Sequence, residues 1–185
     1  MTIPRIADGF LKIVRGEGPV LDHRAFKVYS KATDLGRTSA AIRDRYQKAL
    51  ERLVDRGLIT ARSDDLKDPD SLRVYRPVDT PPVRIRGRGD RSLDEIPLAE
   101  ITGLIRKLEL TRGEAYEDEE HRFRRILEVY ELLRLTSKSK SRLRLARERA
   151  DLPNWSRATR ESAESGAESG PAPRRRKPRR RLRHG

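Results

Sequence analysis

The clearest structural signal in the sequence lies at residues 38–57, which have the sequence TSAAIRDRYQKALERLVDRG. Apolar side chains recur there every three or four positions, the spacing of one helix face: Ile42, Tyr46, Ala49, Leu50, Leu53 and Val54. Thr38 or Ser39 can cap the start of this helix, and Gly57 suits its end. The segment predicts an amphipathic helix over about residues 39–56.

Two helices are predicted before this segment. Pro4 suits a first helical turn, and apolar residues follow it at helical spacing: Ile6, Phe10, Ile13 and Val14. Residues 16–19, GEGP, should end that helix because glycine and proline both interrupt it. A second helix is predicted from Asp22, a good N-cap residue, with Ala25, Phe26 and Tyr29 on one side.

Strands are predicted after residue 57. Leu58–Arg62 and Leu72–Val78 flank an aspartate-rich loop, and Val83–Arg86 is a candidate third strand. Over residues 3–91 the predicted order is therefore helix, helix, helix and basic hairpin. This order is typical of a winged helix-turn-helix unit, so we expect a mainly α fold with a small β-hairpin.

Residues 92–155 are predicted to be a helical extension. One helix begins at Pro97, and a longer one, about Glu114–Leu135, should bury Phe123, Ile126, Leu127, Tyr130 and Leu133. A third helix follows Thr136-Ser137, with Leu143, Ala146 and Ala150 as a thin apolar stripe. Short matches, such as Gly9-Phe10-Leu11 with Gly103-Leu104-Ile105, leave open whether this part repeats the first domain or resembles it by chance.

Residues 156–185 are rich in Ser, Glu, Gly and Pro and then in arginine, so we expect a disordered basic tail. Residues 171–185 hold eight basic and no acidic residues, which is eight of the formal net charge of +14. Such a tail is either a nonspecific solvated arm or a contact for DNA or RNA. Its candidate contacts are Arg174, Arg175, Arg176, Arg179, Arg180 and Arg181.

The composition excludes several classes of protein. The chain has no cysteine, which rules out disulfides, zinc ribbons and thiol chemistry. We find no apolar run of membrane-spanning length and no signal peptide, so we expect a cytoplasmic protein, nucleoid-associated if bacterial. No phosphate loop, nucleophile elbow or paired zinc motif occurs, so no catalysis, cofactor or metal is expected.

The helix at 39–56 is the natural recognition helix of a winged helix-turn-helix unit. Its ridge opposite the apolar stripe is acidic and contains Asp44, Glu51 and Asp55, but one flank is basic. A groove contact would therefore use Thr38 and Ser39 at the helix start together with Arg45, Lys48 and Arg52 on that flank. The alternative is a solvated surface with Asp44 paired to Lys48.

The region from Leu72 to Arg91 contains six arginines and only two aspartates. In Val83-Arg84-Ile85-Arg86, alternation would place both arginines on one strand face, where their forks suit phosphate groups. Candidate phosphate contacts in this region are Arg73, Arg84, Arg86 and Arg88. The alternative is a charged edge that only prevents strand pairing.

Five segments also resemble a known domain in their order and spacing. They are GEGPV at 16–20, RTSAAIR at 37–43, LVDRGLI at 53–59, VRIR at 83–86 and EIPLAEI at 95–101. Together they are similar to the uncharacterised C-terminal domain of large bacterial superfamily 1 helicase–nuclease proteins, across about residues 3–110. The helicase motor and nuclease domains of those proteins have no counterpart in this sequence. The resemblance implies a winged-helix-like accessory unit in DNA processing without catalysis.

We therefore expect a non-catalytic protein that binds duplex DNA through phosphate contacts. One alternative is an interaction module that docks a helicase or another DNA-processing partner, which the acidic residues around Glu114 favour. The other is RNA or ribosome binding through the tail.

Overall fold

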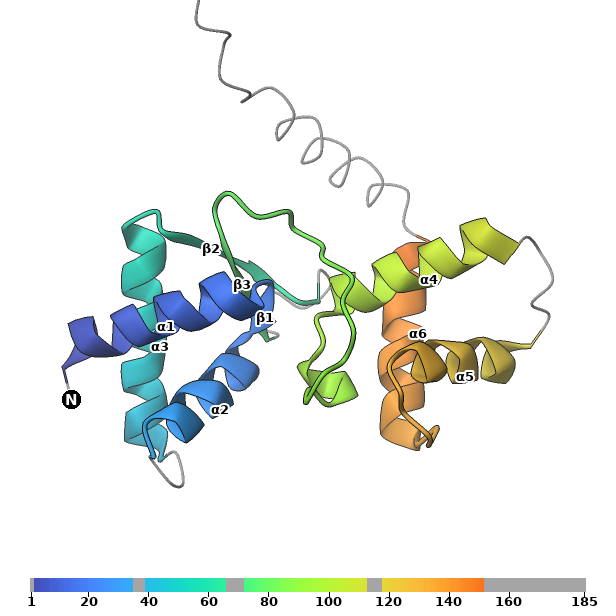
Figure 1. Ribbon diagram of the computed structural model, residues 1–185, viewed down its shortest axis with the longest axis horizontal. Helices are drawn as coiled ribbons and strands as arrows, with labels where there is room; N and C mark the ends of the chain where they lie inside the picture. The colour runs from blue at the N-terminus through green and yellow to red at the C-terminus, as the bar shows by residue number, and fades with distance from the viewer. Residues whose placement is uncertain (1, 35–38, 66–71, 113–117, 152–185) are drawn as a thin grey trace, which may run out of the picture.

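The computed structural model describes residues 2–34, 39–65, 72–112 and 118–151. These residues form six α-helices, a short 3-10 helix and a small antiparallel sheet, so the fold is mainly α (Figure 1). In chain order the elements are α1 (Ile3–Glu17), β1 (Val20–Leu21), α2 (Asp22–Ala32), α3 (Ala40–Asp55), β2 (Ile59–Ser63), β3 (Arg73–Pro77), η1 (Leu93–Glu95), α4 (Leu98–Arg112), α5 (Glu119–Val129) and α6 (Ser137–Ala150). None of the described helices is long and apolar enough to cross a membrane.

The buried apolar side chains fall into two clusters. One belongs to α1–α3 and the sheet, which we call the N-terminal unit, and the other to η1 and α4–α6, the C-terminal unit. Residues 78–92 form the connector between them. Figure 1 shows the two units at opposite sides of the molecule, with the connector arching from β3 before it reaches η1.

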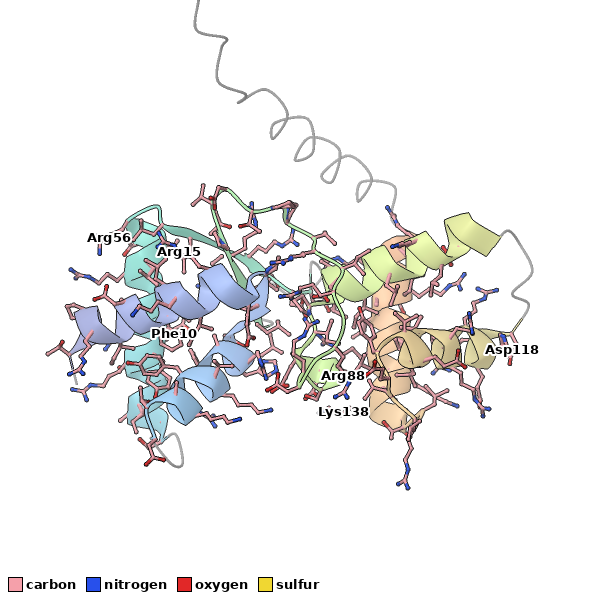
Figure 2. All side chains as sticks on the ribbon, viewed as in Figure 1. Phe10, Arg15, Arg56, Arg88, Asp118 and Lys138 are labelled. Carbon is pink, nitrogen blue, oxygen red and sulfur yellow. The ribbon has the colours of Figure 1, made fainter. Side chains whose placement is uncertain are left out.

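The core of the N-terminal unit contains four aromatic rings in mutual contact, those of Phe10, Phe26, Tyr29 and Tyr46. Phe10 of α1 stacks on Tyr29 of α2 with ring centroids 4.7 Å apart, and Tyr46 of α3 meets both rings edge-on at 5.2 Å. Figure 2 shows Phe10 between these helices. Gly9 allows this approach, because a Cβ there would lie 2.3 Å from the Tyr29 ring. The predicted apolar faces of the first three helices are confirmed.

The third strand of the sheet is β1, and the prediction of a strand at Val83–Arg86 is wrong. The strand order is β1-β3-β2, with Val20 opposite Tyr75 and Ile59 opposite Pro77. Val83 and Ile85 instead pack on α4, where a Cβ at Gly103 would lie 3.2 Å and 3.4 Å from them. The predicted inward packing holds only in part, because Val83 is partly buried whereas Ile85 is 41% exposed.

Helix ends follow local capping. Ser39 caps α3 by accepting a hydrogen bond from Ile42 N, whereas Thr38 lies outside the described residues. Asp22 is the first residue of α2 and not its N-cap, which is Leu21, because Val20 and Leu21 are extended in β1. The Asp22 carboxylate still accepts a hydrogen bond from the next backbone N–H, at 2.6 Å.

In the C-terminal unit, the long helix predicted over Glu114–Leu135 is only α5, Glu119–Val129. Glu131 adopts a positive φ of 54°, and the N–H groups of Glu131 and Leu132 donate to the carbonyls of Glu128 and Leu127. This pairing is a Schellman motif, which ends a helix. Leu133 is consequently fully exposed and not buried, whereas the other four predicted core residues of this helix are buried.

The third helix of this unit follows the prediction closely. Thr136 caps α6 in a capping box with Ser139, and Leu143 and Ala146 are buried while Ala150 is partly buried. α4 packs chiefly on α6, as α1 packs on α3, but this similarity leaves the question of a repeat open. The predicted disordered tail, residues 156–185, lies outside the described residues.

Leu53→Asp should unfold the N-terminal unit, since Leu53 is buried in its core at 1% exposure. A carboxylate at this position would be buried without a partner, which together with the lost apolar packing should cost about 4 kcal/mol or more. Chemical denaturation followed by circular dichroism measures the change. Asp55→Asn, an exposed position on the same helix, is the control, and a Leu53→Asp variant as stable as that control would contradict the buried face.

Candidate nucleic-acid interface

The surface of α3 offers a row of exposed cations. Arg45, Lys48, Arg52 and Arg56 are all exposed on the helix flank, whereas Tyr46, Ala49, Leu50 and Leu53 face the core. We call the four cations the α3 basic face. Figure 1 shows α3 on the side of the N-terminal unit away from α4–α6, and Figure 2 labels Arg56 at its C-terminal end.

Acidic residues adjoin this face. Asp44 pairs with Lys48 at 2.8 Å, as predicted for a solvated helix surface, and both side chains are more than half exposed. Glu51 accepts a hydrogen bond from Gln47, which also contacts the Tyr75 hydroxyl. An exposed ion pair of this kind contributes little to stability, so a phosphate can replace Asp44 as the partner of Lys48.

The β2–β3 hairpin contributes one predicted contact residue with an exposed side chain, Arg73, while its tip at residues 66–71 lies outside the described part. The loop end of the hairpin, at Asp64, is held by the C-terminal unit. The Asp64 carboxylate accepts hydrogen bonds from Leu98 N at 2.8 Å and Arg142 at 3.1 Å, and Arg149 donates to the Asp64 carbonyl. Burial raises the pKa of Asp64, and Arg142 opposes that shift.

Of the four connector arginines, Arg84 is free, whereas Arg86, Arg88 and Arg91 are engaged within the fold. Arg84 is exposed, in agreement with a surface contact. Arg86 is 19% exposed; it pairs with the buried Glu100 at 2.9 Å and also donates to the Glu17 and Pro19 carbonyls. Arg88, labelled in Figure 2, donates to the Tyr130 carbonyl at 2.8 Å. The expectation that Arg84 and Arg86 share one phosphate-facing side is therefore wrong.

Carboxylates remote in sequence explain this outcome. Glu100 is 2% exposed and accepts hydrogen bonds from the guanidinium groups of both Arg86 and Arg91 and from Arg86 N. Arg24 of α2, 4% exposed, pairs with Glu17 and Asp90 and lies 3.7 Å from Glu95. The hydrogen bond to Glu17 is the main cause that raises the pKa of Arg24 above its ordinary value. We call these contacts the junction, since they join the two units.

The basic residues of α6 are also engaged within the fold. Each of the six has an acidic partner or a carbonyl acceptor: Lys138 with Asp94, Lys140 with Glu120, Arg142 with Asp64, Arg144 with Glu119, Arg147 with Glu109 and Arg149 with the Asp64 carbonyl. The hydrogen bond from Lys138 lowers the pKa of Asp94 to about 2. The matching acids come from α4, α5, η1 and Asp64.

The acidic cluster before α5 has a structural role in its described part. Asp118 caps the helix by accepting hydrogen bonds from Glu120 N and His121 N, and Glu119 and Glu120 pair with α6; Glu114 and Glu117 are outside the described residues. Within the described part of the chain, no group of three or more potential ligand side chains could hold a metal ion.

Sequence reasoning missed the junction, although one signal was present. In IPLAEI, residues 96–101, Glu100 interrupts an apolar run, and a carboxylate in such a position needs a cationic partner. The identity of that partner depends on the path of the connector. The tail arginines Arg174, Arg175, Arg176, Arg179, Arg180 and Arg181 lie outside the described residues.

Comparison of the chain with protein-family models, curated proteins and solved structures finds no match. The resemblance to the helicase-associated domain therefore stays a hypothesis.

Glu100→Gln should destabilise the protein by about 3–5 kcal/mol, because it leaves two buried guanidinium groups without their shared charge. Glu128→Gln is the matched control: Glu128 pairs with Arg125 at the surface, and its loss should cost less than about 1 kcal/mol. Urea denaturation of both variants checks the difference. Equal stability of the two variants would show that the junction charge is dispensable.

Proposed function

We propose that residues 3–91 form a winged helix-turn-helix unit and that the protein binds duplex DNA, without catalysis, through phosphate contacts of α3. The order α1-β1-α2-α3-β2-β3 and the strand order β1-β3-β2 support this interpretation, since three helices are followed by an antiparallel hairpin. In such a unit α3 is the recognition helix and the hairpin is the wing.

The α3 basic face is the observation that carries the proposal. Its cations lie on one flank of a helix whose opposite side is anchored in an aromatic core, so their spacing is fixed before binding. The engaged arginines of the connector and α6 leave fewer alternative cations in the described part. Asp44, Glu51 and Asp55 border the face and disfavour close contact with base edges, so binding should depend on phosphates and differ little between sequences.

Replacing Arg45, Lys48 and Arg52 together by Gln should weaken duplex binding and flatten the slope of log affinity against log salt by up to about 2.7, about 0.9 for each lost phosphate contact. The matched control replaces Arg124, Arg134 and Arg144, three exposed cations of the C-terminal unit, and so removes the same charge. Fluorescence anisotropy with the full chain at several salt concentrations measures both. Equal slopes in the two variants would remove α3 from the interface.

RNA or ribosome binding through the tail remains a further candidate, based on the sequence of residues 174–181. Replacing the six tail arginines by Ser in the full chain separates the two functions. Duplex binding by α3 should keep its dependence on Arg45, Lys48 and Arg52, whereas loss of all binding to duplex DNA and structured RNA would assign the contact to the tail.

A second candidate function is docking of a helicase or another DNA-processing protein, favoured by a groove with leucines on the C-terminal unit. This groove of about 590 Å³ is lined by Leu127, Leu132, Leu133 and Leu135, with Glu120, Glu128, Glu131 and one cation, Arg124, around them. Leu133 is fully exposed. Leucines bordered by carboxylates suit an amphipathic segment of the partner that carries basic residues.

Leu133→Asp should abolish recovery of such a motor protein from nuclease-treated extracts while leaving duplex affinity unchanged. Leu133 makes no core contact, so the variant should fold with unaltered stability. Pull-down with identification of the recovered protein, in parallel with the anisotropy assay, measures both effects. Equal recovery by the wild type and the variant would exclude this groove as the docking site.

A further inference from the structure

Two arginines on the sheet differ from the arginines of the junction. Arg62 of β2 and Arg76 of β3 are both half-buried, yet no carboxylate of the described residues lies within hydrogen-bond distance of either guanidinium group. By contrast, Arg24, Arg86 and Arg91 are each held by carboxylates at the junction. The pair is therefore a place where buried positive charge is not neutralised.

The strand register brings the two side chains together. Arg62 lies opposite Val74, and Arg76 lies opposite Thr60, so the arginines are diagonal neighbours on the same face of the sheet. Diagonal positions are about 7 Å apart, within reach of long side chains. The other face carries Tyr75 into the N-terminal core, so the pair faces the connector and the C-terminal unit.

The partners of the pair are backbone carbonyls. Arg62 donates to the Pro82 carbonyl at 2.6 Å, and its buried Nε has no hydrogen-bond partner. Arg76 donates to the carbonyls of Pro77, Val78 and Thr80. Carbonyl dipoles satisfy some N–H groups and hold the connector in place, but they do not supply a counter-charge.

The electrostatics of the surroundings are positive. Burial, reinforced by the nearby charges of Arg149 and Arg76, lowers the pKa of Arg62 to about 10, and burial lowers that of Arg76. The acids that act on this region are Asp64 and Asp65, and Asp64 is already engaged by Arg142. An anion bound between Arg62 and Arg76 would offset the excess charge.

We propose that Arg62 and Arg76 form an oxyanion site that binds a phosphate group, supplied either by a nucleic-acid backbone or by a free phosphate. The planar forks of two guanidinium groups match phosphate oxygens bidentately, which a lysine cannot do. The site is separate from the α3 basic face, so it does not rest on the proposed function. A phosphate bound there would also add to the contacts that Arg62 and Arg76 make with the connector.

The first test is titration of the full chain with inorganic phosphate, at constant ionic strength maintained with chloride. Saturable chemical-shift changes are expected at the amides of β2, β3 and residues 80–84, and phosphate at about ten times its dissociation constant should raise the Tm by about 3–6 °C. Arg62→Gln should weaken phosphate binding about tenfold or more, because a charged hydrogen-bond donor is lost. Arg134→Gln, an exposed arginine of the C-terminal unit, should leave it unchanged.

The source of the phosphate group follows from a second arm with a duplex oligonucleotide. If Arg62→Gln weakens duplex binding and inorganic phosphate competes with the duplex, the group belongs to the nucleic acid. If phosphate binds but duplex affinity is equal in the variant and wild type, the ligand is a free phosphate. Loss of duplex binding in the α3 triple variant alone tests the proposed function and leaves this site unaffected.

A purely structural role for the pair predicts a different result. Arg62→Gln would then lower the Tm, but phosphate would cause no saturable shifts in β2 and β3 of the wild type, and duplex affinity would be unchanged. That outcome would overturn the proposal. Arg62→Lys, which keeps the charge but loses the fork, covers the case in which Arg62→Gln fails to fold: it should stay folded and bind phosphate more weakly than the wild type.

Discussion

Burial of Glu100 between Arg86 and Arg91 is the constraint on which the rest of the arrangement depends. A carboxylate at 2% exposure must be paired and hydrogen-bonded, and here both guanidinium groups and a backbone N–H meet it. Because both arginines come from the connector, their pairing fixes its path. That path in turn places Glu95 of η1 beside Arg24 and Lys27 of α2.

Internal ion pairing also decides which cations remain available to bind a ligand. Arginines at the junction and on α6 neutralise acids from distant parts of the chain, so much of the basic composition in the described residues is internal. The exposed flank of α3 and the Arg62–Arg76 pair are exceptions of different kinds. The first is solvated and suited to a long polyanion, whereas the second is half-buried and suited to a single phosphate group.

Capping and core patterns could be predicted because they depend on neighbours within one or two helical turns. Ser39, Thr136 and the apolar stripe of α3 are examples. The end of α5 could not be predicted, since the Schellman turn at Glu131 requires a positive φ that its side chain does not favour. Likewise β1 is two residues long, and it is a strand only because β3 lies beside it.

For the candidate site, the sequence by itself determined the basic flank of α3, because helical periodicity fixes which residues share a side. It also determined that the chain carries an excess of cations and cannot use cysteine chemistry. Only the tertiary structure decided which cations remain available. Arg84 and Arg86 are two residues apart, yet one is exposed and the other is held by Glu100 and by carbonyls of residues 17 and 19. The partners of Arg86 are 14 or more residues away in the sequence. Which residues become its partners depends on the tertiary fold, and no local sequence pattern predicts it.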